Sequence, residues 1–304
     1  MDVSVVIPVK DRAHLIGRCL DSVAAQTLQP SHVYVVDNAS TDNTLETMRQ
    51  WANAHPEFPL TLLSETTPGA SAARNCGLAH VDTEYVYFFD SDDEMMPRLL
   101  ERAAATIGDA DLVYWKGEVV NLKGKHWEKT FHDSKDFLRN HFYNSILSTQ
   151  LYIIRTQLIR DVGEWNTDAS VWNDWELGVR IALAEPRVVC LPEVLTLIHA
   201  QKNSITGVKY SHRIGDWENT LDIAERAIFD SDRTAEEITR LRLMLIYRRV
   251  NLAALYRREG NQEAAKELLE STLADERLDP DKRFLLRFAY YYTAFGGRGA
   301  YYFF

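Results

Sequence analysis

Two aspartates that could bind a metal ion follow a hydrophobic run in the first third of the chain. The run Tyr-Val-Tyr-Phe-Phe at 85–89 leads directly into Asp90 and Asp92. Three other Asp-x-Asp triplets occur, at 109–111, 230–232 and 279–281. None of those three follows such a run, which separates the first triplet from them. Its carboxylates suit Mn²⁺ or Mg²⁺ with phosphate oxygens completing the shell, although the same residues could simply form an Asx turn after a strand.

Polar side chains also end two other hydrophobic runs. The run at 3–9 is followed by Asp11, and the run at 33–36 ends in Asp37 and Asn38. In an open α/β sheet, ligands bind at the carboxyl ends of parallel strands. We therefore expect these carboxylates to meet at one edge of a sheet, with a cation offsetting their repulsion.

A cluster of small residues at 67–73 precedes Arg74. Small residues let a backbone approach a ligand closely, and a helix that begins near Ala70 would direct N–H groups at a phosphate. Arg74 would lie one turn inside that helix. The alternative is an ordinary helix start with a solvated arginine.

A third cluster combines acids with tryptophans. Asp174 and Glu176 lie near Trp165, Trp172 and Trp175 at the start of a predicted helix. Aromatic rings suit the apolar faces of sugar rings, while carboxylates accept hydroxyl hydrogens. The alternative is a helix N-terminus with favourable acids and tryptophans in the core.

The elements that would position these residues alternate along the first half of the chain. Hydrophobic, β-branched runs predict strands, and helical spacing of apolar residues predicts helices between them. We expect strands at 3–9, 33–37, 60–64, 85–90, 112–115, 151–155 and 188–191. Helices are expected at 13–26, 44–55, 70–80 and 174–185. This alternation predicts an α/β fold with a Rossmann-like, mostly parallel sheet flanked by helices.

Strand patterns are absent beyond about residue 215. Helical patterns there cover 214–229, 235–259, 262–276 and 281–294. We therefore expect a catalytic domain at 1–210 and a C-terminal all-helical region at 211–304.

Composition excludes several classes of protein. The 304 residues contain 34 Lys and Arg against 44 Asp and Glu, a net charge of −10 that argues against a nucleic-acid partner. No apolar run reaches the roughly 18–20 residues that span a bilayer. The start of the chain lacks a basic segment and resembles a core strand, not a signal peptide. Three widely spaced cysteines favour a reducing, cytoplasmic location.

Taken together, these motifs resemble family 2 of the inverting nucleotide-sugar glycosyltransferases, which have the GT-A fold. The resemblance covers about residues 3–205 and depends on five stretches in the order of the family. They are Val-Ser-Val-Val-Ile-Pro-Val at 3–9, Val-Val-Asp-Asn-Ala-Ser-Thr-Asp-Asn-Thr at 35–44, Pro-Gly-Ala-Ser-Ala-Ala-Arg-Asn at 68–75, Phe-Phe-Asp-Ser-Asp-Asp at 88–93 and Asn-Asp-Trp-Glu-Leu-Gly-Val-Arg at 173–180.

The resemblance implies a nucleotide pocket at the first two strands. Pro8, Val9 and Asp11 would line this pocket, and Asp37 occupies the place of an acid near the nucleobase. Many members have a second Asp where this chain has Asn38, so either residue is a candidate for reading the base.

The resemblance also implies contacts to the rest of the donor. Arg74 would face the base and the diphosphate, and Asp90 would contact the ribose. Asp92 would bind the Mn²⁺ or Mg²⁺ ion that bridges the phosphates.

For catalysis, Asp174 matches the base of the family, although Asn173 replaces a common acidic neighbour. Many members have a His three residues before a Ser. Here Gln201 precedes Ser204 at that distance, and His199 is the nearby candidate for the metal, or else an ordinary histidine at a strand end.

The implied function is metal-dependent, inverting transfer of a sugar from a nucleoside-diphosphate sugar, a UDP-sugar first, to an acceptor hydroxyl. The acceptor would be a saccharide or a lipid-linked molecule, in cell-surface polysaccharide or glycolipid assembly. The alternative is a nucleotide-binding, non-catalytic helical scaffold. A nucleotidyltransferase is disfavoured because the loop after the first strand has no glycine, and a processive synthase because transmembrane helices and a Gln-x-x-Arg-Trp stretch are missing.

The last 23 residues, 282–304, contain ten aromatic and four basic residues and no acid. Aromatic rings with Arg and Lys suit a membrane interface. We expect one of three roles for this segment: peripheral contact with the inner face of a membrane, docking on the protein through Phe284, Phe288 and Tyr291, or a homodimer contact.

Overall fold

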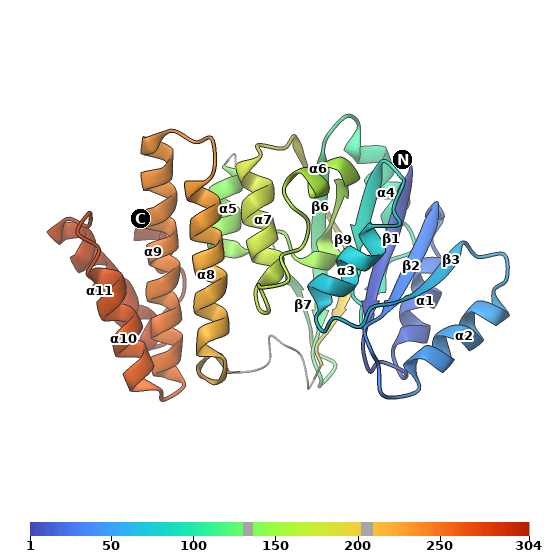
Figure 1. The fold of residues 1–304 in the computed structure, drawn as a ribbon, viewed down its shortest axis with the longest axis horizontal. Helices are drawn as coiled ribbons and strands as arrows, with labels where there is room; N and C mark the ends of the chain where they lie inside the picture. Colours follow the sequence, from blue (N-terminus) through green and yellow to red (C-terminus); the bar gives the residue numbers. More distant parts are fainter. Residues whose placement is uncertain (130–135, 202–208, 304) are drawn as a thin grey trace.

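The computed structural model describes residues 1–129, 136–201 and 209–303. Within them a sheet of nine strands has helices on both faces, and a block of helices follows (Figure 1). The strands are β1 (Val3–Val9), β2 (His32–Asp37), β3 (Leu60–Ser64), β4 (Tyr85–Phe88), β5 (Glu94–Met95), β6 (Leu112–Val120), β7 (His126–Lys129), β8 (Tyr152–Arg155) and β9 (Val188–His199).

The helices divide into two groups. Those of the first part are α1 (Ile16–Ala24), α2 (Thr44–Ala54), α3 (Ala70–Leu78), α4 (Leu99–Ile107), α5 (Phe137–Asn144), α6 (Thr156–Asp161) and α7 (Asn173–Leu183). Those of the C-terminal part are α8 (Ile214–Phe229), α9 (Ala235–Arg258), α10 (Gln262–Leu273) and α11 (Pro280–Ala294).

Strand direction gathers several loops at one edge of the sheet. The sheet order is β3-β2-β1-β4-β8-β6-β9-β5, with β7 beside β6. Strands β1 to β4 pair in parallel, β8 is antiparallel to both of its neighbours, and β9 is parallel to β6. Consequently β1, β2, β4 and β9 all end at the same edge. The mostly parallel α/β sheet predicted from the sequence is confirmed.

Strand β1 is central because hydrophobic side chains cover both of its faces. Val5 and Ile7 belong to a core shared with α1, α2 and α4. Val6 points to the opposite side and joins a second core with α3, α6 and α7. A strand that is buried on both faces holds the loop after it in a fixed place.

The C-terminal helices share a core with the first part of the chain. Phe142 of α5 and Trp175 and Val179 of α7 belong to the same buried cluster as residues of α8, α9, α10 and α11. Figure 1 shows α7 between the sheet and α8 and α9. The division at 210 and 211 stays a prediction, but the packing makes the helical part a support for α7.

Gly178 allows α5 and α7 to approach closely. A Cβ at this position would lie 2.3 Å from the His141 ring. His141 is fully buried and its Nε2 lies 2.9 Å from the carbonyl oxygen of Trp175. Burial lowers the pKa of His141 to about 4, so the ring is neutral at pH 7.

We therefore expect Gly178→Ala to destabilise the protein by about 1–3 kcal/mol, because the added methyl group displaces a packed ring. Urea unfolding of both proteins measures the difference. Gly215→Ala in α8 is the matched control, because its Cβ would meet nothing within 4 Å. The control should unfold at the same or a slightly higher urea concentration, since alanine favours a helix. Equal stability of both variants would contradict the packing argument.

Helix α11 packs through a different face from the one predicted. Leu286 and Tyr290 are buried, whereas Phe284, Phe288 and Tyr291 are exposed by 71%, 45% and 47%. Docking through those three residues was the wrong prediction, because the face of α11 that packs against the other helices carries Leu286 and Tyr290. A membrane or homodimer contact through 282–304 stays a prediction. Across the described ranges, none of the helices combines the length and apolar character needed to cross a bilayer.

Candidate active site

The acids at the ends of β2 and β4 lie on either side of β1. Asp37 pairs in register with Val9 of β1, and on the other side Phe88 pairs with Val6. The N–H of Phe89 continues this pairing at 2.9 Å from the Val6 carbonyl oxygen. Asp90 therefore emerges at the same edge as Asp37, as the sequence predicted.

Asp11 and Asn38 connect the loops around this edge. Asp11 has a left-handed backbone (φ +50°), and its Oδ1 accepts the N–H of Thr41 at 2.6 Å. This hydrogen bond lowers the pKa of Asp11. The Asn38 Nδ2 donates to the Thr67 carbonyl oxygen at 2.8 Å, and its Oδ1 accepts the N–H of Gly69 at 2.8 Å. Both side chains thus hold loops in place.

Unlike Asn38, Asp37 has a side-chain oxygen that accepts no hydrogen bond from the described residues. The residue is 5% exposed, and its Oδ2 accepts the N–H of Ser40 at 3.4 Å. Its Oδ1 is buried and has no hydrogen-bond partner in the described part of the chain. Because buried polar atoms normally have partners, this oxygen suggests a missing ligand. Of the two residues proposed to read the base, Asp37 has the available acceptor. Pro8 and Val9 are buried beside it.

Arg74 is buried, so its interpretation as a solvated helix residue is wrong. It is 5% exposed, its Nη2 donates to Asp90 Oδ1 at 2.9 Å, and its guanidinium lies 4.3 Å from the centroid of Trp165. Its Nε and Nη1 have no hydrogen-bond partner among the residues described. Two buried donors on a cation are suited to a phosphate or a base carbonyl.

Asp92 is a largely buried carboxylate next to a second acid, Asp90. Burial and the charge of Asp90 raise the pKa of Asp92 to about 6. The Nε of Arg12 lies 3.8 Å from Asp92 Oδ2, too far for a hydrogen bond. A divalent ion beside Asp92 would relieve this repulsion, and its carboxylate is a hard oxygen donor of the kind that such ions take.

His199 reaches the same edge at the end of β9, but another acid engages its ring. Its N–H donates to Asp93 Oδ1 at 2.8 Å, and its Nε2 lies 2.6 Å from Glu94 Oε1. Within the described ranges, no group of three or more His, Cys, Asp or Glu side chains is arranged to hold an ion. A metal role for His199 stays a prediction. Ser204 of the same motif lies outside the described residues.

Asp174 lies at the start of α7, which follows the sheet strand β8 and the helix α6. The preceding Trp172 is left-handed (φ +47°), and Asp174 Oδ1 accepts the N–H of Trp175 at 2.8 Å. Burial raises the pKa of Asp174, and the charges of Arg74 and Asp90 also act on it. The neighbouring Asn173 donates from its Nδ2 to Ser71 Oγ at 3.3 Å, which brings the start of α7 against α3, the helix that carries Arg74. Asp174 is therefore not separated from the acids at the strand ends.

Lys129 is a further candidate site residue, which the sequence did not predict. The positive charge of Lys129 lowers the pKa of Asp174. The negative charge of Asp93 acts on Lys129 in the same way and favours its charged form. The Nζ donates to Ser148 Oγ. Because Lys129 ends a four-residue strand whose other side chains are exposed, no periodic pattern marked its position.

The predicted aromatic walls are wrong for two of the three tryptophans. Trp165 is 2% exposed and packs against Phe88, and Trp175 is 0% exposed and packs against Phe142. They are core residues because both sheet and helices cover them. Trp172 keeps partial exposure.

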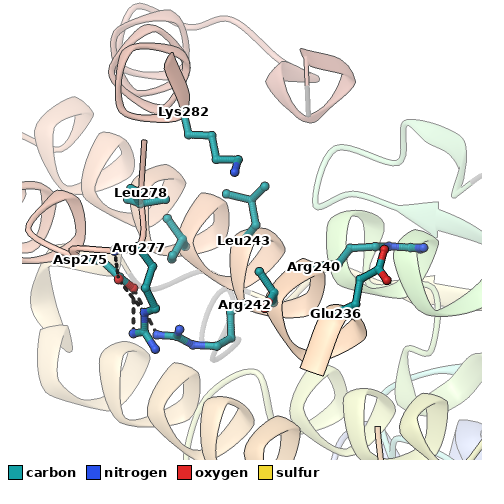
Figure 2. Close-up of a pocket in the computed structure, with 10 residues that line it drawn as sticks. Glu236, Arg240, Arg242, Leu243, Asp275, Arg277, Leu278 and Lys282 are labelled. Atoms are coloured by element: carbon teal, nitrogen blue, oxygen red, sulfur yellow. Dashed lines mark hydrogen bonds and ion pairs between the residues drawn. The ribbon is translucent and has the colours of Figure 1, made fainter. Parts of the chain in front are cut away.

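A cavity of about 460 Å³ lies in the helical part, away from these acids (Figure 2). Its lining comes from α9 and from residues 275–282. Arg242 and Arg277 both bind Asp275, at 3.1 and 2.8 Å. The cavity contains neither Asp174 nor an acid from a strand end, so it is not the candidate active site.

Comparison with known proteins identifies the family. The model of "Glycosyl transferase family 2" matches residues 4–160. An uncharacterized glycosyltransferase of Bacillus subtilis, YwdF, is 26% identical over 60% of this chain and 68% of its own length. Glycosyltransferase AglE of Haloferax volcanii is 36% identical over 42% of this chain, and the match spans only 40% of that protein.

Solved structures show the same fold. The structure of S. aureus TarS 1-349 in complex with UDP-GlcNAc has a TM-score of 0.74 and 22% identity, covering 95% of this chain and 87% of that one. Mannosyltransferase PcManGT from Pyrobaculum calidifontis, in complex with GDP-Man and Mn²⁺, has a TM-score of 0.61 and 23% identity, covering 98% and 88%. These likenesses establish the GT-A fold expected from the sequence. With the family model matching more than half of its residues, the chain belongs to glycosyltransferase family 2.

Proposed function

We propose that the chain transfers a sugar from a nucleoside-diphosphate sugar to an acceptor hydroxyl, with inversion and with a divalent metal ion. The observation that carries this proposal is the set of unsatisfied groups at one edge of the sheet. It comprises an Asp37 oxygen and two Arg74 donors that have no hydrogen-bond partner among the described residues, together with the raised pKa of Asp92. The pKa of Asp174 responds to the charges of Arg74 and Asp90 in this set.

The donor would bind across the ends of β1, β2 and β4. Asp37 Oδ1 can accept an N–H from a nucleobase such as uracil, thymine or guanine. Among these donors a UDP-sugar is the first candidate, because TarS was solved in complex with UDP-GlcNAc. Arg74 would contact the diphosphate while its bond to Asp90 keeps it in place. TarS with UDP-GlcNAc and PcManGT with GDP-Man support a nucleotide-sugar donor.

The metal ion would bind at Asp92. When bound, it offsets the negative charge that accumulates on the leaving diphosphate, a contribution of several kcal/mol in metalloenzymes generally. Support comes from the raised pKa of Asp92 and from the Mn²⁺ complex of PcManGT.

Asp174 would be the general base. The acceptor oxygen attacks the anomeric carbon, the bond from that carbon to the diphosphate oxygen breaks, and the hydroxyl proton moves to Asp174. Attack from the side opposite the leaving group inverts the anomeric centre. The raised pKa of Asp174 favours this role, because a base works best when its pKa is near the working pH. We place the acceptor among saccharides or lipid-linked molecules of cell-surface assembly.

A thermal-shift screen with UDP, GDP and dTDP sugars, each with and without Mn²⁺, tests the proposal. We expect UDP-sugars with Mn²⁺ to give the largest rise in melting temperature, since a ligand at 100 times its Kd stabilises by about 2.7 kcal/mol. Release of nucleoside diphosphate with the same donors then separates a transferase from a nucleotide-binding scaffold. Absence of any shift with every donor would overturn the proposal.

A further inference from the structure

A second cavity lies between α5, α9 and the C-terminal residues 293–301. The charge of its lining is unusual for this protein. The cavity has a volume of about 240 Å³, and Arg248, Arg258 and Arg298 line it. No Asp or Glu occurs among its described lining residues, although the whole chain carries a net charge of −10. In contrast, the arginines Arg242 and Arg277 of the larger cavity in Figure 2 are neutralised by an aspartate.

The three arginines differ in their exposure to solvent. Arg258 and Arg298 are exposed, and neither side chain has an ion-pair partner in the described part of the chain. Arg248 is half-buried: its Nη1 donates to the Phe142 carbonyl oxygen at 2.7 Å and its Nη2 to Ser145 Oγ at 3.2 Å. Its Nε is buried without a hydrogen-bond partner among the described residues. A buried donor with two cations nearer the solvent is an arrangement that attracts an anion.

The remaining lining is largely aromatic and neutral. Tyr143 stacks against Tyr301 at a centroid distance of 5.2 Å and meets the edge of Tyr247 at 5.4 Å. Aromatic rings of this kind pack against the apolar faces of sugars. The volume is below the roughly 300–1,000 Å³ of pockets for drug-sized ligands, so the occupant is small.

The cavity lies next to the helix that carries the predicted base. The Arg248 guanidinium is 4.5 Å from the centroid of Trp172 and 4.1 Å from that of Trp175, the residues on either side of Asn173 and Asp174. Figure 1 shows α7 between the sheet, where we place the donor, and α9, which carries Arg248. The cavity therefore lies beside the two tryptophans that flank Asn173 and Asp174, on the side of α7 away from the sheet.

We propose that this cavity binds the phosphate group of a phosphorylated saccharide acceptor. The phosphate contacts Arg248, Arg258 and Arg298, and the tyrosine rings cover the adjoining sugar. This inference rests on the proposed function, since it needs Asp174 to face the acceptor.

Calorimetry with the full chain tests the proposal, with UDP and Mg²⁺ present to fill the donor site. The probes are glucose 6-phosphate, glucose and inorganic phosphate at low ionic strength, because salt screens exposed charges. The variant is Arg258→Ala with Arg298→Ala, whose side chains are exposed and whose removal leaves the core intact. Arg226→Ala is the control, since Arg226 is exposed on α8 and lies outside the cavity.

We expect glucose 6-phosphate to bind the unmodified chain and the control equally, and the double variant at least about tenfold more weakly. Glucose should not bind measurably, and inorganic phosphate should bind more weakly than the sugar phosphate. Equal affinity in all three proteins, or no binding, would overturn the site. Inorganic phosphate binding as tightly as glucose 6-phosphate would overturn the saccharide part. UDP affinity measured on the same proteins reports separately on the donor site: its failure in the unmodified chain would refute the proposed function and not the cavity.

Discussion

Replacing Asp174 by Asn is expected to lower the turnover number at least about 100-fold while leaving donor affinity nearly unchanged. The amide cannot take the acceptor proton, but its oxygen can still accept the N–H of Trp175, the bond that Asp174 makes at 2.8 Å. The start of α7 should therefore keep its shape. Steady-state release of nucleoside diphosphate gives the turnover number, and calorimetry with UDP gives the affinity.

The pH profile provides a second readout of the same residue. Burial raises the pKa of Asp174, so the base loses its proton only at a higher pH than an ordinary aspartate does. Activity should fall as the pH drops through this raised pKa. The positive charge of Lys129 favours the carboxylate form of Asp174. Lys129→Met removes this charge and should therefore move the acid limb of the pH profile to higher pH.

Asp168→Asn is the matched control, because Asp168 is an exposed acid in the loop before α7. It should keep full turnover and an unchanged pH profile. Turnover near that of the unmodified chain in Asp174→Asn would remove Asp174 from the role of base. An acid limb that does not move in Lys129→Met would show that Lys129 has no electrostatic effect on the base.

The elements that the sequence predicted well are those with strong hydrophobic patterns. The bounds predicted for 3–9, 60–64 and 214–229 match β1, β3 and α8. The missed elements include β5 and β7, which have two and four residues. Strands that short are held by their partners β9 and β6, and pairing between distant segments leaves no local pattern.

Strand β9 shows how a local rule can fail. The prediction ended this strand at Leu191, and the next residue, Pro192, cannot donate to a central ladder. In the structure, Pro192 and Glu193 instead form a β-bulge. Leu191 pairs with Trp115, and after the bulge Val194 pairs with Lys116. Arg102 binds the Glu193 carboxylate, with Nε–Oε2 at 3.0 Å. The strand then continues to His199, which brings this residue to the edge of the site.

Residue types at the strand ends predicted the place of the site, whereas their individual use depended on tertiary contacts. Asn38 and Asp37 are neighbours in sequence, yet the loop after β3 binds the Asn38 amide, whereas one Asp37 oxygen has no hydrogen-bond partner among the described residues. The tryptophans near Asp174 likewise looked like ligand walls, because the sequence does not show that α5 and Phe88 cover Trp175 and Trp165. Spacing locates a site, and packing decides which atoms remain available.

Replacing Asp92 by Asn is expected to abolish most of the effect of Mn²⁺ on UDP binding, weakening it at least about tenfold. UDP binding without metal should change little. Burial and the Asp90 charge raise the pKa of Asp92 to about 6, so at pH 7 the group is mostly ionised and its charge destabilises the folded protein when no cation is bound. Neutral Asn removes that repulsion, and the metal-free variant should melt at the same or a higher temperature than the unmodified chain.

Loss of the Mn²⁺ effect together with an unchanged or higher melting temperature identifies Asp92 as a metal ligand. A structural carboxylate would instead give a lower melting temperature without metal when it is replaced. Asp109→Asn is the matched control: Asp109 begins another Asp-x-Asp triplet, but it is 93% exposed and pairs with Arg187 at 2.7 Å. Calorimetry with UDP, with and without Mn²⁺, should leave this control unchanged. If Asp92→Asn keeps the full Mn²⁺ effect, the metal must bind elsewhere on the strand ends, and the raised pKa of Asp92 then reflects its burial beside Asp90 alone.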